Sequence, residues 1–148
     1  MTVRFCLGSQ MNKHIIPVVI GILRRKNSYL LTKRVQDGEW VHEKWQFPGG
    51  ELKFGESFEQ GLRRELREEL GIEVNPPTSP QLVYESIRSY WHGILLCFFV
   101  EVKQHRELKI KLNEEASEFR WFKLAEIMKL DTLPLVKDMT KDADNVSS

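Results

Sequence analysis

The stretch GGELKFGESFEQGLRRELREELGI, residues 49–72, constrains the fold more than any other part of the chain. It predicts a helix from roughly Ser57 to Leu70, because Ser57 with Gln60 three residues later fits a capping box. Gly71 stands where a helix often ends in a left-handed cap. Apolar residues recur at every fourth position and form one stripe, namely Phe58, Leu62, Leu66 and Leu70. The stretch therefore predicts an amphipathic helix with one face on a core.

Three glutamates crowd this predicted helix, Glu65, Glu68 and Glu69. Each like-charge pair at such spacing costs only about 0.2–0.5 kcal/mol when exposed, so energy alone permits a solvated acidic face. The neighbouring glycines Gly49 and Gly50 add a second feature, because glycine lets the backbone approach another group closely. Carboxylates beside exposed carbonyls suit Mg²⁺ or Mn²⁺, and Mg²⁺ shares its remaining positions with phosphates. The alternative to a solvated face is therefore metal-assisted attack of water on phosphorus.

The rest of the chain alternates between predicted strands and helices. Apolar and β-branched runs predict strands at 14–25, 29–35, 45–47, 81–90, 93–103 and 117–124. The first two are separated by a short turn and predict a hairpin. Residues 124–130 and 133–141 predict two short helices. The expected division is an N-terminal arm at 1–13, one α/β domain at 14–141 and a flexible C-terminal tail at 142–148.

Composition limits the class of protein. The chain has 148 residues, enough for one domain with a substantial core. Lys and Arg number 22 against 21 Asp and Glu, so no basic excess favours binding to polymeric nucleic acid. Cys6 and Cys97 stand in no metal-ligand spacing and favour a reducing, cytoplasmic location over a disulfide scaffold. The longest apolar run, residues 93–100, is too short to span a membrane.

The opening stretch resembles the Nudix box of the MutT-like nucleotide pyrophosphohydrolases. The box reads G-x₅-E-x₇-R-E-U-x-E-E-x-G-U, with U a bulky apolar residue. Its fixed positions are filled here by Gly50, Glu56, Arg64, Glu65, Leu66, Glu68, Glu69, Gly71 and Ile72. The preceding WQFPGG is typical of MutT-like members, and the order of strands agrees over roughly residues 15–139. The resemblance implies an α/β/α sandwich with a mixed β-sheet and a catalytic loop–helix–loop. It also implies a divalent metal and hydrolysis of a nucleoside diphosphate linked to another group.

The same resemblance implies roles for residues of the box. Metal binding would fall to the carboxylates of Glu65, Glu68 and Glu69 and to the carbonyl of Gly50. Arg64 would hold a catalytic glutamate by a charge-assisted hydrogen bond. Structural roles would fall to Gly49, Glu56 and Gly71.

A further acidic residue is expected from a loop before the last strand. In LNEEASEFRWF the candidates are Glu114 and Glu115, and the position of Trp121 favours Glu115 as metal ligand or base. Two solvated loop acids are the alternative interpretation. Glu65 and Glu115 are the candidates for the general base.

Substrate contacts are expected on the strands around the box. Family members often place a basic residue of the second strand against the phosphates, where this chain has Lys33 and Arg34. Trp45 and Phe47 are predicted to contact the base, and Tyr90 and Trp91 are further candidates. Ordinary solvation is the alternative for the two basic residues, and an ordinary core or rim position for the aromatic ones.

The favoured substrate is a nucleoside or deoxynucleoside triphosphate, cleaved to the monophosphate and pyrophosphate, because the LNEE loop resembles that of triphosphate-cleaving members. The alternatives are a dinucleoside polyphosphate, an NDP-sugar or ADP-ribose, and a nucleotide-sensing module without turnover. Every glutamate of the box is present, which favours an enzyme over a sensor. Many relatives dimerise, so a homodimer stays open, whereas no membrane partner is expected.

Overall fold

A mixed seven-stranded β-sheet forms the centre of the structure, a computed structural model that describes residues 14–36, 41–89, 91–103 and 106–147. Five strands follow the order β3-β2-β1-β6-β5, with β4 paired to β1 and β7 paired to β2. The bounds are β1 His14–Arg25, β2 Ser28–Arg34, β3 Trp45–Gln46, β4 Gly49–Glu51, β5 Leu82–Arg88, β6 Trp91–Glu101 and β7 Ala116–Lys123. β1 and β6 run parallel, while β1 pairs with β2 and with β4 in antiparallel fashion. The predicted β1–β2 hairpin is confirmed.

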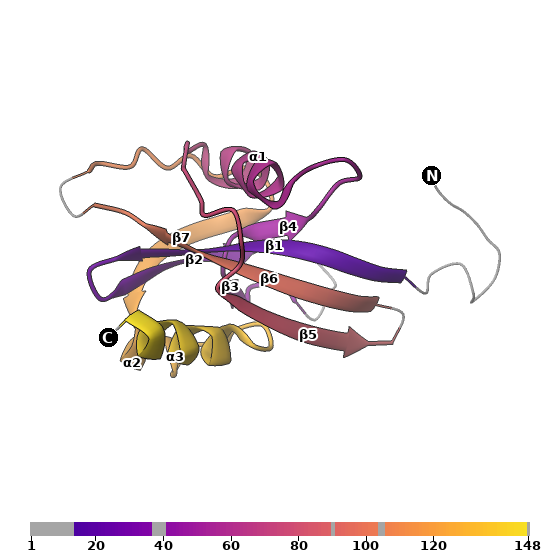
Figure 1. Ribbon diagram of the computed structural model, residues 1–148. Coiled ribbons are helices and arrows are strands. Elements are labelled where there is room, and N and C mark those ends of the chain that lie inside the picture. The colour runs from indigo at the N-terminus through magenta and orange to yellow at the C-terminus, as the bar shows by residue number, and fades with distance from the viewer. Residues whose placement is uncertain (1–13, 37–40, 90, 104–105, 148) are drawn as a thin grey trace.

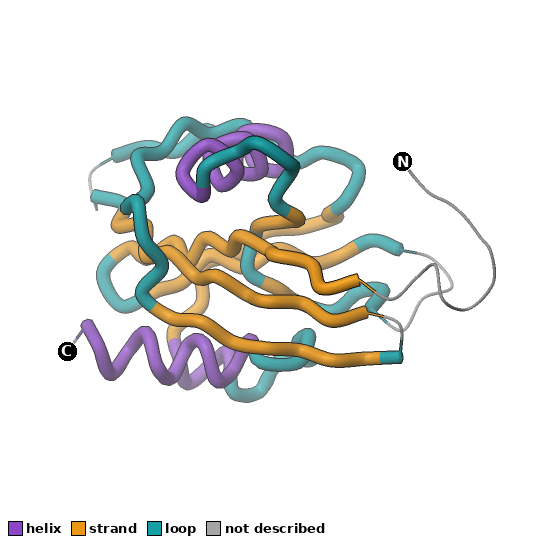
Figure 2. Tube along the Cα trace, turned by 45° about the vertical axis from the view of Figure 1, so that its right-hand side comes forward, coloured by secondary structure: helices purple, strands orange, loops and turns teal. Residues whose placement is uncertain are grey.

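Helices cover both faces of the sheet. α1, Phe58–Leu70, lies on one face, and α2, Leu124–Ile127, lies with α3, Val136–Ser147, on the other (Figure 1). The strands run between these two helical layers (Figure 2). Each face has its own apolar core, one built around the leucines of α1 and one around residues of α2 and α3 such as Ile127 and Met139. The predicted α/β/α sandwich with a mixed sheet is confirmed.

The ends and the apolar face of α1 agree with the sequence pattern. Ser57 Oγ accepts a hydrogen bond from the Gln60 N–H at 3.1 Å. The Gln60 side chain accepts in turn from the Ser57 N–H at 2.9 Å, so both bonds of the capping box are present. Gly71 adopts φ 67°, so the helix ends in a left-handed cap. The leucines of the stripe are fully buried, and Phe58 contacts Phe98 with 6.0 Å between ring centroids. Local capping and tertiary packing thus fix the same helix.

A further strand, which the sequence pattern does not predict, follows β3. Gly49–Glu51 forms the short strand β4, whose residue Gly50 pairs with Val19 of β1. Leu52 continues the contact, because its N–H donates to the Pro17 carbonyl at 3.0 Å. This pairing is long-range and carries no local sequence signal. It places the two glycines of β4, Gly49 and Gly50, between β1 and α1.

The predicted flexible tail is wrong for residues 142–147, because α3 continues through Ser147. Ala143 is buried, and two tyrosines of the sheet hold the helix on either side of it. Tyr84 Oη donates to Asp142 at 2.5 Å, and Tyr29 Oη donates to Asp144 at 2.9 Å. Asp142 and Asp144 therefore anchor this segment to the sheet. Residue 148 and the predicted arm at 1–13 lie outside the described residues.

In the part of the chain that the structure describes, the helices are too short or too polar to cross a membrane.

Candidate active site

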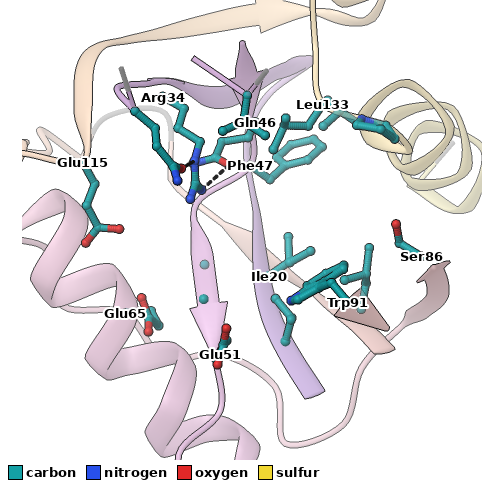
Figure 3. Close-up of a pocket in the computed structure, with 18 of the residues that line it drawn as sticks. Ile20, Arg34, Gln46, Phe47, Glu51, Glu65, Ser86, Trp91, Glu115 and Leu133 are labelled. Atoms are coloured by element: carbon teal, nitrogen blue, oxygen red, sulfur yellow. Dashed lines mark hydrogen bonds between the residues drawn. The ribbon is translucent and has the colours of Figure 1, made fainter. Parts of the chain in front are cut away.

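A cavity of about 910 Å³ is lined by residues of α1, of several strands of the sheet and of the start of α3. Acidic and glycine residues line one end, including Gly50, Glu65 and Glu115. Aromatic and aliphatic side chains line the other end, where Figure 3 shows Trp91 and Phe47 across the cavity from the carboxylates. The cavity therefore joins a charged end to an apolar end.

Glu69 is the buried member of the acidic cluster. It is 4% exposed, and its Oε2 accepts a hydrogen bond from the Gly49 N–H at 3.1 Å. Burial raises the pKa of this carboxyl far above the usual glutamate value, and the negative charges of Glu65 and Glu115 raise it further. The three carboxylates thus lie close enough to repel one another.

Arg64 holds the outer carboxylates of the cluster. Its guanidinium donates to both oxygens of Glu56, at 2.6 and 3.0 Å, and to Glu65 at 2.8 Å. Glu68, with a side chain 47% exposed, is a further partner at 3.2 Å. The paired guanidinium lowers the pKa of Glu56 to about 2, so this carboxylate stays ionised. Glu56 also accepts from the Lys53 N–H at 2.8 Å, which ties the loop before α1 to the helix.

Gly50 leaves space for the close approach of Glu65. A Cβ built on Gly50 would lie 2.5 Å from the carboxylate atoms of Glu65. Any other residue would force this carboxylate to shift, so the glycine lets the backbone of β4 lie against the carboxylate where it stands. The Gly50 carbonyl and the Glu65 carboxylate, both expected as metal ligands, therefore belong to residues that lie side by side in the cavity.

Glu115 reaches the same cavity from the loop before β7. Its carbonyl accepts from the Val35 N–H at 2.9 Å, and its Oε2 accepts from Asn113 Nδ2 at 3.1 Å. Glu115 lines the cavity, whereas Glu114 is not among the lining residues. The structure thus places Glu115, rather than Glu114, beside the carboxylates of α1.

The two basic candidates on β2 point to different places. Arg34 lines the cavity and donates to Gln36 at 2.9 Å and to Gln46 at 3.3 Å. Lys33 is not among the lining residues. Its Nζ lies 3.9 Å from Glu118 and 5.7 Å from the centre of the Trp45 ring. A register shift between residues 33 and 34 accompanies this division.

The aromatic candidates divide in the same way. Phe47 lines the cavity, while Trp45 packs in the core against Phe122 with 4.9 Å between ring centroids. Trp91 lines the cavity, and Tyr90 lies outside the described residues. The structure therefore brings Arg34 and Phe47 to the site and leaves Lys33 and Trp45 away from it.

Sequence reasoning missed several lining residues, among them Gln46, Ser86 and Arg88. Ser86 and Arg88 lie on the half-buried side of β5, where exposure alternates along Leu82–Arg88. The sequence does not show this alternation, because the apolar Ile87 is exposed whereas the polar Ser86 and Arg88 are half-buried. The register of β5 with β6 decides which face meets the cavity.

The acidic end suits a divalent cation. Its donors are all oxygens, one carboxylate is buried among like charges, and the missing Cβ of Gly50 leaves room beside Glu65. Within the described ranges, no group of three or more acidic, histidine or cysteine side chains stands in metal-binding geometry. Arg64 lies 2.8 Å from Glu65 and 3.2 Å from Glu68.

Comparison with known proteins finds relatives of this chain in sequence and in structure. Residues 13–143 match the family profile of the NUDIX domain. The nucleoside triphosphatase NudI of Escherichia coli strain SE11 is 31% identical over 123 residues, covering 77% of this chain and 86% of that protein. The MutT protein of Methanosarcina mazei Go1 has a similar structure, with a TM-score of 0.78 and 26% identity over 92% of this chain and 97% of the other. A C. elegans Ap4A hydrolase shares the fold, with a TM-score of 0.73 and 14% identity over 88% and 96% of the two chains.

Proposed function

This chain belongs to the Nudix hydrolase family, whose members hydrolyse phosphoanhydride bonds of nucleotides, and on this premise we propose a nucleoside or deoxynucleoside triphosphate as its substrate. The products would be the monophosphate and pyrophosphate. The observation that carries this choice is the similarity to a relative named as a nucleoside triphosphatase. The likeness to an Ap4A hydrolase extends to the fold alone and gives no equal support to a dinucleoside polyphosphate.

The cavity supports a nucleotide of this kind. Its acidic end, with Glu65 and Glu115, is where a metal-bound phosphate chain would lie, and its apolar end offers Phe47 and Trp91 to a base. Arg34 lines the same cavity, and the hydrogen bonds from its guanidinium to Gln36 and Gln46 fix its direction. A guanidinium fixed in this way suits a phosphate oxygen.

Nudix hydrolases generally need a divalent metal, and we assign Mg²⁺ to this chain, with Mn²⁺ as its substitute. The ligands would be the Gly50 carbonyl and the carboxylates of Glu65, Glu68, Glu69 and Glu115. When bound, the ion would neutralise phosphate charge and lower the pKa of a bound water. Oxygen-only donors fit either ion and disfavour softer metals.

The chain's own residues divide the remaining work. Arg64 fixes Glu65 through a 2.8 Å hydrogen bond and is itself fixed by Glu56. Glu65 and Glu115 both line the cavity, and we propose them as the two candidates to take a proton from the attacking water. Glu65→Gln and Glu115→Gln show which of the two is the general base. Only the variant that lacks the base should lose the fall of kcat on the acid side of its pH profile.

The test is turnover of a nucleotide panel with Mg²⁺, with products separated by chromatography. The panel holds the eight common ribo- and deoxyribonucleoside triphosphates, ADP-ribose, an NDP-sugar and a dinucleoside polyphosphate. We expect the triphosphates to give monophosphate and pyrophosphate with the highest kcat/KM. Release of a nucleoside diphosphate and orthophosphate from a triphosphate would overturn the proposal. A higher kcat/KM for another class of nucleotide would also overturn it.

A further inference from the structure

Two glutamines hold the side chain of Arg34 in the cavity. The Arg34 Nε donates to Gln36 Oε1 at 2.9 Å, and its Nη1 donates to Gln46 Oε1 at 3.3 Å. All three residues line the cavity, and they come from β2, from the loop after β2 and from β3. A guanidinium can only donate hydrogen bonds, so the amide oxygens of the glutamines face it. We refer to Arg34, Gln36 and Gln46 as the glutamine–arginine group.

The backbone fixes the place from which Arg34 extends. The Arg34 N–H donates to the Lys44 carbonyl at 3.0 Å, and the Arg34 carbonyl accepts from the Glu43 N–H at 2.7 Å. The register of β2 with β7 shifts just before Arg34, and an irregularity of this kind changes the direction of a side chain. Gln46 is fixed separately, because β3 pairs it with Thr32 of β2. The strands therefore set the geometry of the group.

Neither glutamine compensates the charge of Arg34. Both partners are neutral amides, whereas Arg64 on α1 is paired with the carboxylates of Glu56 and Glu65. The charge of Arg34 acts within the cavity: burial lowers the pKa of Arg88, and the positive charge of Arg34 lowers it further. Among the described residues, the side-chain bonds of Arg34 use two of the five N–H groups of a guanidinium. The group thus presents a directed cation to a ligand.

The group lies between the two ends of the cavity. In Figure 3, Glu65 and Glu115 lie on one side of Arg34, and Phe47 lies beside Gln46 on the other. A nucleotide with its phosphate chain at the acidic end and its base near Phe47 has the sugar-linked phosphate between these ends. After the proposed cleavage this phosphate stays in the monophosphate, while pyrophosphate leaves.

We propose that Gln36 and Gln46 are positioning residues that direct Arg34 toward the sugar-linked phosphate and preserve its charge, and this inference rests on the proposed function. A carboxylate at either position would also hold the guanidinium, but it would compensate the charge that a phosphate needs. A neutral amide holds the guanidinium by a hydrogen bond alone, so the charge remains for bonds to the ligand. Binding of the monophosphate therefore depends on the glutamine–arginine group, whereas binding of pyrophosphate at the acidic end does not.

The first test measures monophosphate binding by calorimetry in wild type, Arg34→Ala, Gln46→Leu and the double variant. The ligands are dAMP, dCMP, dGMP and dTMP, added to metal-free protein. Arg34→Ala should weaken binding by about tenfold to a hundredfold, and Gln46→Leu by about twofold to tenfold. The double variant should bind as Arg34→Ala does, because Gln46 acts only through Arg34. A further loss in the double variant would overturn the inference, as would the absence of monophosphate binding by wild type.

The second test addresses the charge of Arg34. Gln46→Glu keeps an acceptor toward the guanidinium but adds a compensating charge, so it should bind monophosphates no better than Arg34→Ala. Wild-type affinity in Gln46→Glu would overturn the role of the neutral amide. The matched control is Gln81→Leu, because Gln81 is exposed, is not among the lining residues and accepts from the Phe99 N–H at 2.8 Å. This control should bind monophosphates as wild type does.

Binding of pyrophosphate with Mg²⁺ separates a local effect from general damage to the cavity. Its affinity should be the same in wild type and Gln46→Leu, because the acidic end does not include the glutamine–arginine group. Equal weakening of pyrophosphate and monophosphate binding in Gln46→Leu would contradict the inference. None of these measurements requires turnover, so they test the group even if no triphosphate is hydrolysed.

Discussion

Glu69→Gln should stabilise the metal-free protein although it removes a residue of the proposed metal site. The Glu69 carboxyl is 4% exposed and lies near the charges of Glu65 and Glu115. Burial first, and these two charges next, raise its pKa from 4.5 to about 9. Glutamine removes the charge and keeps an oxygen for the Gly49 N–H, which lies 3.1 Å from Glu69 Oε2 in the wild type.

The sign and size of the effect follow from the two pKa values. The folded protein holds a proton on Glu69 that the unfolded chain loses above pH 4.5. The contribution of Glu69 to the free energy of unfolding is therefore fully present below pH 4.5 and is lost as the pH rises toward 9. The slope is at most about 1.4 kcal/mol per pH unit, which sets an upper bound of roughly 3 kcal/mol at pH 7. Sharing of the proton with neighbouring carboxylates reduces this to about 1–3 kcal/mol, or about 3–10 °C in Tm.

Thermal unfolding in chelator at pH 5 and pH 8 is the assay. The control is Glu59→Gln, because Glu59 lies on the same helix, is partly exposed and pairs with Arg63 outside the cavity. Glu69→Gln should melt above wild type at pH 8 and close to it at pH 5, while Glu59→Gln should show no such pH-dependent gain. A Glu69→Gln protein that melts at or below wild type at pH 8 would refute the reasoning.

Three further predictions concern the surroundings of the site. Gly50→Ala places a methyl group 2.5 Å from a carboxylate and should lower kcat by about a hundredfold, since small displacements cost that much; an unchanged kcat would count against the close approach. Glu56→Gln removes a carboxylate whose pKa Arg64 lowers to about 2 and should destabilise by about 1–3 kcal/mol. In urea unfolding this difference should be full above pH 4.5 and vanish toward pH 2, and a difference that grows in acid would contradict the ion pair. Tyr84→Phe removes the bond to Asp142 and should lower Tm by about 3–6 °C with kcat/KM unchanged, whereas an equal Tm would show that this bond does not stabilise α3.

The helix α1 could be predicted from sequence because its determinants are local. Ser57 and Gln60 cap it, Gly71 ends it, and the leucines repeat with the helical period. The clustering of its glutamates is equally local, since residues three and four apart share a helix face. The fold family and the glutamates that α1 contributes to the acidic end follow from this one segment, whereas Glu115 comes from the loop before β7.

The apolar end could be predicted only in part, because long-range pairing determines which of the candidate residues reach the cavity. Arg34 enters the cavity and Lys33 does not, and the register shift between them has no sequence signature. Arg88 and Trp91 meet only through the register of β5 with β6. The prediction of a flexible tail at 142–147 is wrong for a related reason. Asp142 anchors α3 only through its bond to Tyr84, which is distant in the sequence.

The measurement that tests the central claim most directly is Mg²⁺-dependent pyrophosphate release from a triphosphate by Glu69→Gln and Glu59→Gln. Both variants replace one glutamate of α1 by glutamine. Of the two glutamates, only Glu69 is buried and bonded to Gly49 of β4. Loss of an outer partner of a metal ligand costs about 10–100-fold, so loss of a ligand should lower kcat/KM by more than about a hundredfold. The account predicts that loss for Glu69→Gln and wild-type turnover for Glu59→Gln. Equal turnover by the two variants would contradict it.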